Sequence, residues 1–114
     1  MSAMTDRELL ELAARAAGYQ IDFTDWRDCG GWTDYRKIPG GYWNPLVNDG
    51  DALRLACQLS IDVIVRTISV IAGDASPGGK VVTVECGGRP NGREVAARRA
   101  IVQAAARIGK DKPQ

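Results

Sequence analysis

Two runs rich in β-branched residues, 61–71 and 80–86, lie close together in this chain, with one loop-forming stretch between them. Valine, isoleucine and threonine favour extended strands, because their branched side chains pack well on a pleated surface. Residues 73–79 between the runs hold three glycines and a proline, which are typical of turns. We therefore predict a long strand over 61–71 that forms an antiparallel hairpin with a second strand over 80–86.

Three other segments have the apolar spacing of amphipathic helices, and each begins at residues that can cap free backbone amides. Thr5 and Glu8 have the spacing of a capping box, in which each side chain accepts from the other residue's backbone amide. Gly18 stands where a left-handed residue commonly ends a helix. The predicted helices are residues 6–17, a second that begins at residues 48–51, and a third over residues 95–108 that ends at Gly109.

The order of these elements predicts an α+β fold. A short strand is expected over residues 19–23 and an irregular one near residues 32–38. Helices at both ends and in the middle then give a layered α/β/α sandwich, with three helices around a mainly antiparallel sheet of about three to five strands. A chain of 114 residues fits a single domain over 1–114. Its ends, residues 1–4 and 110–114, are expected to fray.

Composition excludes several classes of function. The formal net charge of +1 gives no overall field that would steer the chain to nucleic acid or to a membrane surface. The absence of histidine removes Ser-His-Asp and Cys-His catalysis and most zinc and haem sites. Three cysteines without C-x-x-C spacing fit reduced thiols in a cytosolic protein, and the polar start of the chain predicts no signal peptide. We expect no metal and no cofactor.

All three tryptophans fall between residues 24 and 47, among turn-forming glycines, aspartates and arginines. Trp43 precedes a capped helix and is predicted to anchor in the core. Tryptophan and tyrosine beside arginine are also typical of interface hot spots, whereas a folded-over loop that completes a small core is the structural alternative. The partner-binding candidates in this segment are Trp26, Trp32, Tyr35 and Arg36.

The central run of the chain, WNPL at 43–46 followed by DGDALRLA at 49–56, resembles small bacteriophage proteins grouped as the phage ABA sandwich domain. ELLELAA at 8–14 and ARRAIVQAAA at 97–106 look like the first and last helices of that family. The resemblance implies a sheet between helical layers and an origin in a tailed phage or prophage. It implies no activity and no functional residues.

The turn GGRPNGRE at residues 87–94 joins the last predicted strand to the last helix, and two of its glycines have the spacing found in a P-loop. An arginine replaces the P-loop lysine, and a glutamate replaces the hydroxyl residue that would hold magnesium, so nucleotide hydrolysis is not favoured. Backbone amides and arginines could still hold an anion, and a plain capped turn is the alternative. The anion-binding candidates are Gly88, Arg89, Gly92 and Arg93.

Two groups of polar or charged residues have both a structural and a functional interpretation. Asn48, Asp49 and Asp51 fit helix capping better than a site for a hard cation, because no bidentate glutamate follows at the required distance. Arg98, Arg99 and Arg107 are interpreted as a solvated helix face, with contacts to a phosphate backbone as the alternative.

With the phage origin that the resemblance implies, we expect a small bacteriophage accessory protein of the host cytoplasm that acts by binding a host or phage macromolecule, for example in host takeover or anti-defence. The expected partner is a host or phage protein. The alternative is a small-molecule, nucleotide or anion-binding domain that uses the turn at residues 87–93. No catalytic constellation is found, so an enzyme is the weaker class. Nucleic acid is not expected as a partner, and self-association is a further prediction. A protein binder should expose a broad apolar patch.

Overall fold

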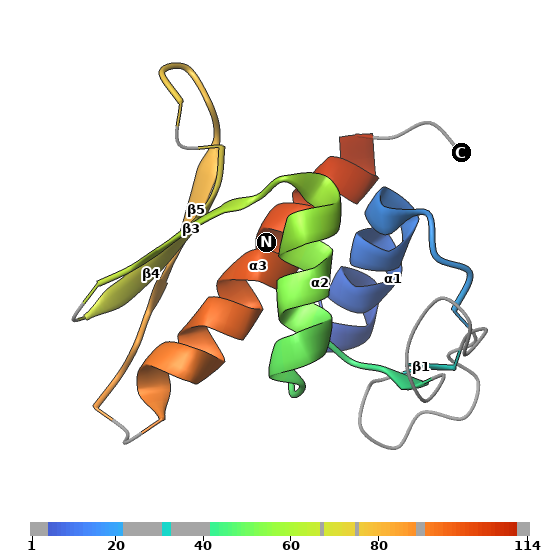
Figure 1. Ribbon diagram of the computed structural model, residues 1–114, viewed down its shortest axis with the longest axis horizontal. Helices are drawn as coiled ribbons and strands as arrows, with labels where there is room; N and C mark the ends of the chain where they lie inside the picture. Colours follow the sequence, from blue (N-terminus) through green and yellow to red (C-terminus); the bar gives the residue numbers. More distant parts are fainter. Residues whose placement is uncertain are drawn as a thin grey trace.

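Three helices and a three-stranded antiparallel sheet form the fold, which confirms the predicted α+β class (Figure 1). The computed structural model describes residues 5–21, 31–32, 42–66, 68–74, 76–88 and 91–111; the side chains of residues 31–32 lie outside this description. The elements in chain order are α1 (Asp6–Ala17), β1 (Gly31–Trp32), β2 (Tyr42–Trp43), α2 (Asp49–Leu59), β3 (Asp62–Val65), β4 (Ser69–Gly73), β5 (Val81–Glu85) and α3 (Gly92–Asp111).

The long helix α3 is the element against which the others pack. It contacts β3, β4 and β5 on one side and both α1 and α2 on the other (Figure 1). The layers are therefore the sheet, α3, and then α1 with α2. The core follows this order: Val70 and Ala72 of β4 are fully buried on the sheet side, and Leu10 and Leu55 are fully buried on the helical side.

The predicted starts of the first two helices are confirmed by their caps, whereas the third helix begins at Gly92, before the predicted residue 95. The Glu8 backbone amide donates to Thr5 Oγ1 at 3.2 Å, and the Thr5 amide donates back to the Glu8 carboxylate, so the capping box is complete. Gly18 ends α1 in the left-handed conformation, with φ of 77°. The side chain of Asn48 caps α2 by accepting from the Asp51 amide at 2.9 Å. These ends are fixed by contacts within a few residues, which is why the sequence predicts them well.

The predicted end of the last helix at Gly109 is wrong. α3 begins at Gly92 and continues through Gly109 to Asp111. Gly109 is buried, and a Cβ atom at this position would clash with the backbone carbonyl of Leu12 in α1. Glycine is used here because it lets the backbones of two helices approach closely, and not because it stops a helix.

The predicted single strand over residues 61–71 is also wrong, because the chain turns back between Arg66 and Ser69. The Arg66 amide donates to the Ser69 carbonyl at 2.8 Å, so this run supplies both β3 and β4. An eleven-residue strand would extend about 36 Å, whereas two short strands pack side by side on α3. The predicted hairpin between β4 and β5 is confirmed, and the Asp74 amide closes it by donating to the Lys80 carbonyl at 3.0 Å.

The strand register places two sets of side chains on opposite faces of the sheet. Ala72 pairs with Val63 on one side and Val82 on the other, and these residues share the face toward α3. The opposite face carries Ile71, which is half-buried, and its partner Ile64, which is 38% exposed. The sheet therefore buries one face against α3 and leaves apolar groups accessible on the other.

Candidate functional site

The predicted partner-binding residues fall outside the described part of the chain or at its margin. Trp26, Tyr35 and Arg36 lie outside it. Trp32 lies in β1, where its backbone pairs with Tyr42 of β2. A role of these residues in binding therefore stays a prediction.

Trp43, in contrast, is a core residue, as predicted. Its side chain is 1% exposed, and its ring meets that of Tyr19 edge-on, with centroids 5.8 Å apart and planes at 78°. Edge-to-face contacts of this kind stabilise a core beyond the area that they bury. Trp43 thus fixes the segment that enters α2 against the helical layer, and it is not available as a binding group.

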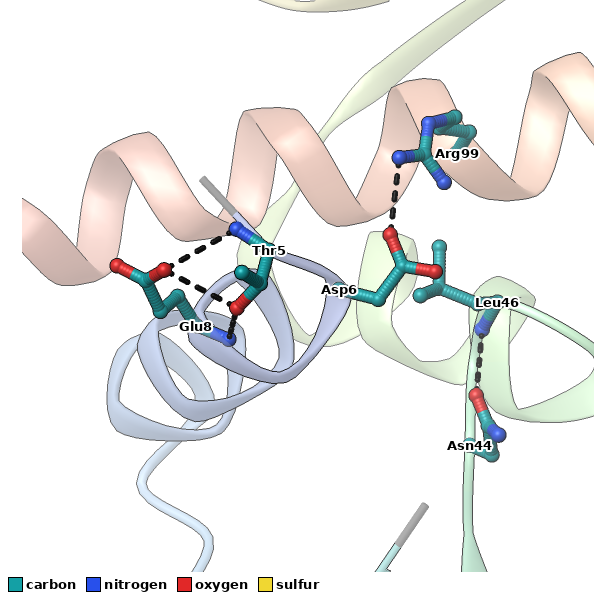
Figure 2. A network of polar contacts seen from close by, with 6 residues as sticks. All are labelled: Thr5, Asp6, Glu8, Asn44, Leu46 and Arg99. Carbon is teal, nitrogen blue, oxygen red and sulfur yellow. Dashed lines mark hydrogen bonds and ion pairs between the residues drawn. The ribbon is translucent and has the colours of Figure 1, made fainter. Parts of the chain in front are cut away.

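Acidic side chains at the start of α2 form hydrogen bonds that fix the segment entering this helix. Asp51 is 3% exposed; one of its carboxylate oxygens accepts from the Asn44 amide at 3.0 Å, and the other accepts from Arg54 at 2.8 Å. Asn44 in turn accepts from the Leu46 amide at 3.1 Å (Figure 2). The capping interpretation is confirmed for Asn48, whereas Asp51 bonds to Asn44 and Arg54, and Asp49 pairs with Arg98. Residues of the segment 43–56, which carries the resemblance to the phage family, therefore have a structural role here.

Arg98 is mostly buried, and Arg99 is paired although its side chain is 39% exposed, which corrects the interpretation of these two residues as a solvated face. Arg98 donates to the Leu46 carbonyl at 2.9 Å and to the Asp49 carboxylate at 2.6 Å, and its side chain is 15% exposed. Arg99 donates to Asp6 at 2.9 Å, so it joins α3 to the start of α1 (Figure 2). Each arginine thus pairs with an acidic residue in the first turn of another helix.

The turn before α3 contains the predicted anion-binding residues. Gly88 and Arg93 are exposed, and Arg89 lies outside the described residues. Gly92 is buried, and a Cβ atom there would clash with the Cys86 carbonyl. Close packing therefore accounts for this glycine without a ligand. Anion binding at the turn stays a prediction.

A hollow of about 750 Å³ lies between α1, α3 and the start of β5. We call it the basic groove, because four of its lining residues are basic and one is acidic. Its members on α3 recur every three or four residues, so they share one face of the helix. The lining residues are Leu9, Lys80, Val82, Arg99, Gln103, Arg107, Lys110 and Asp111.

The positive charges of the basic groove are largely uncompensated. Arg99 is paired with Asp6, but among the described residues none forms an ion pair with Lys80, Arg107 or Lys110. These three side chains are exposed, and Arg107 makes a long hydrogen bond of 3.5 Å to the Val81 carbonyl. Basic groups of this kind attract an anionic ligand without first breaking an existing pair.

Asp74 borders a second hollow of about 380 Å³, which shares Lys80 and Arg107 with the basic groove. The hydroxyl of Ser76 donates to the Asp74 carboxylate, and the Ser76 amide donates to it at 3.0 Å. These hydrogen bonds, that of the hydroxyl first, lower the pKa of Asp74, because they favour the charged form. Asp74 therefore stays ionised at neutral pH and limits the positive charge at this end of the groove.

Several large apolar side chains of the sheet are exposed, and we call them together the apolar sheet surface. Strands that are covered on one face normally place polar residues on the other. Here the exposed face and the β3 edge keep apolar residues instead. The members and their exposed fractions are Val63 (38%), Ile64 (38%), Val65 (56%), Ile68 (77%) and Val81 (40%).

The backbone of β3 adds hydrogen-bonding groups to this surface. In an antiparallel ladder every second residue bonds to the neighbouring strand. Because the Arg66 amide bonds to Ser69 of β4, Val63 and Val65 are the residues whose backbone groups point away from β4. Among the described strands, β3 pairs with β4 and no other. β3 thus presents apolar side chains together with backbone donors and acceptors at one edge.

The described residues offer little for metal or membrane chemistry. In this part of the chain, no group of three or more histidine, cysteine, aspartate or glutamate residues is placed to hold a metal ion. None of the described helices has both the length and the apolar character needed to cross a bilayer.

No protein-family model, curated protein or solved structure matches the chain significantly. The resemblance to the phage ABA sandwich domain thus rests on its sequence segments.

Proposed function

We propose that this chain is a small bacteriophage accessory protein that acts by binding a protein of the host or of the phage, in host takeover or in interference with host defence. In this proposal the apolar sheet surface is the docking site. The observation that carries the proposal is that one small sheet exposes five large apolar side chains. Large apolar side chains that stay exposed in such numbers on one element commonly mark a site of protein association. The phage origin is supported by the resemblance of residues 43–56.

The edge strand β3 suits the addition of a strand from the partner. Ile64 lies on the sheet face away from α3, whereas Val63 and Val65 lie on the face toward it, and all three are exposed. A partner strand beside β3 would bond to its backbone groups and cover side chains on both faces. A second copy of the chain can supply that strand, so self-association through β3 is part of the proposal.

We place this activity in the host cytoplasm. Cys57 and Cys86 are free thiols, the first exposed and the second buried. Unpaired cysteines suit a reducing compartment, where disulfides rarely persist.

The test compares binding by the native chain with binding by the double variant Val65→Asp with Ile68→Asp. Each protein is immobilised and exposed to lysate from phage-infected bacteria, and retained proteins are identified by mass spectrometry. The control is Val47→Asp with Leu53→Asp, which places the same two charges at and just before α2, at side chains that are each 63% exposed. We expect a protein that the native chain and the control retain and the double variant loses. Equal retention by all three would rule out the sheet as the docking site.

Self-association is measured separately by sedimentation of the same three proteins. A dimer formed through β3 should dissociate in the double variant and persist in the control. A dimer that persists in all three would place self-association elsewhere on the molecule.

A further inference from the structure

We propose that the basic groove binds an extended acidic segment of a partner protein, which adds as a strand along the edge of β5 that pairs with no other described strand. This inference goes beyond the docking site proposed above, because it concerns the opposite edge of the sheet. Its ligand is defined by chemistry: a peptide in β-conformation with carboxylates at alternate positions.

The first argument is charge. Lys80, Arg107 and Lys110 are exposed at the groove, and among the described residues no carboxylate pairs with them. Asp111 is the single acidic residue of the lining. The chain as a whole is close to neutral, with a net charge of +1, so this concentration of positive charge is local. Such a surface selects an acidic ligand and repels a basic one.

The second argument is the backbone of β5. The Asp74 amide donates to the Lys80 carbonyl, and the Cys86 amide donates to the Ile68 carbonyl. These two backbone bonds show which residues of β5 pair with β4 and which direct their backbone groups to the other edge. The residues between them that do not bond to β4, Val81 among them, direct their amides and carbonyls to the other edge. The bond from Arg107, which lines the groove, to the Val81 carbonyl confirms that this carbonyl faces it.

That bond is 3.5 Å long, at the upper limit for a hydrogen bond, so a better-placed donor can replace it. The amide of an incoming strand is such a donor. Its arrival would release Arg107 to meet a carboxylate of the same peptide. Backbone pairing and charge recognition are therefore coupled at one residue.

The third argument is length. Arg99 and Asp111 mark the ends of the groove on α3. They are twelve positions apart along the helix, or about 18 Å at 1.5 Å per residue. A strand covers this distance with about five residues, of which about three direct side chains to one face. Leu9 and Val82 also line the groove and offer apolar contact to the remaining side chains.

The test uses a seven-residue peptide that alternates aspartate and valine, with blocked ends, titrated into the isotopically labelled protein at low salt. Binding is followed by calorimetry and by the amide resonances of Val81 and Thr83. We expect these resonances to shift and their hydrogen exchange to slow, because the added strand protects them. Affinity should fall as salt is raised. Binding without any change at these amides would overturn strand addition.

The variant is Arg107→Gln with Lys110→Gln. The matched control is Arg15→Gln with Arg66→Gln, which removes the same two charges from exposed positions outside the groove lining. We expect the groove variant to weaken binding about tenfold and the control to change it less than about twofold. Equal weakening by both would mean that net charge alone attracts the peptide, and would overturn the proposal. Circular dichroism checks that each variant is folded.

Three further ligands complete the test. A peptide with asparagine in place of aspartate should bind at least about tenfold more weakly. Pyrophosphate or a single-stranded oligonucleotide that binds as tightly as the acidic peptide would show a general anion site and overturn the peptide assignment. The double variant Val65→Asp with Ile68→Asp should bind the peptide normally, so the two proposals can fail independently.

Discussion

The helical layer and the three-stranded sheet both pack on α3, but the sheet leaves more of its large apolar side chains exposed than α1 and α2 do. On the helical side, Leu10 and Leu55 are fully buried and Trp43 is 1% exposed. On the sheet, Val65 is 56% exposed and Ile68 is 77% exposed. Burial of apolar area is the main source of stability, so most of it should come from the helical layer. The sheet surface adds little to stability as it stands and is suited to association.

The two regions also differ in how their charges are used. Arg98 and Arg99 are paired with acidic residues of α2 and α1, so they hold the helices together. At the groove beside β5, Lys80 and Lys110 form no ion pair with any described residue. The two arginines therefore connect helices through ion pairs, whereas the lysines beside the sheet are accessible to a ligand. Substitutions in the two regions should therefore have different consequences.

The largest loss of stability is expected for Trp43→Ala. Removing this ring leaves a cavity and breaks the edge-on contact with Tyr19, at a cost of about 3–5 kcal/mol. Urea unfolding followed by circular dichroism measures the change. Ile68→Ala is the matched control on the sheet and should cost far less, because its side chain already meets water. Similar losses in both variants would contradict the contrast between the two regions.

Gly109→Ala should destabilise the protein by about 1–3 kcal/mol, because the new Cβ atom meets the Leu12 carbonyl and forces α1 and α3 apart. Alanine is the better helix former by about 1 kcal/mol, so a loosely packed crossing would instead gain stability. A lower thermal midpoint for Gly109→Ala would confirm the close crossing of α1 and α3, and a higher midpoint would contradict it. Gly88→Ala serves as the control, since a Cβ atom there meets nothing within 4 Å.

Asp51→Ala should cost less than Trp43→Ala and about as much as Gly109→Ala, about 1–3 kcal/mol. The reason is that the buried Asn44 amide would lose its acceptor. Glu11→Ala removes an exposed partner of Arg7 and should change the unfolding free energy by less than about 1 kcal/mol. Denaturant unfolding of both variants at neutral pH tests the difference. Equal effects would mean that the Asp51 carboxylate is not essential for the entry into α2.

The parts of the fold that the sequence predicts correctly depend on neighbouring residues. The Thr5–Glu8 capping box, Gly18 and Asn48 act within a few positions along the chain, and the β4–β5 hairpin is marked by its glycines and proline. The turn between Arg66 and Ser69 was missed because those four positions contain neither glycine nor proline. A β-branched run alone does not say where a strand reverses.

The remaining features depend on residues far apart in the sequence. Gly109 looks like a helix stop until Leu12 is placed beside it. Arg99 looks solvated until Asp6, 93 residues away, is placed in contact with it. The basic groove likewise requires α1, α3 and β5 to meet. Spacing along one segment carries no information on such contacts, so sequence analysis singled out Arg99 and Arg107 but neither Lys80 nor Lys110.

The smallest effect on stability, within about 0.5 kcal/mol, is expected for Ile68→Asp. Its side chain is 77% exposed at the β3–β4 turn, so a carboxylate there stays hydrated and breaks no packing. Thermal unfolding of this variant and of Leu53→Asp, at 63% exposure on α2, should be nearly the same. Their association should differ, because only Ile68 belongs to the apolar sheet surface. A loss of several kcal/mol in Ile68→Asp would mean that the turn is part of the core and would remove the basis for a docking site on the sheet.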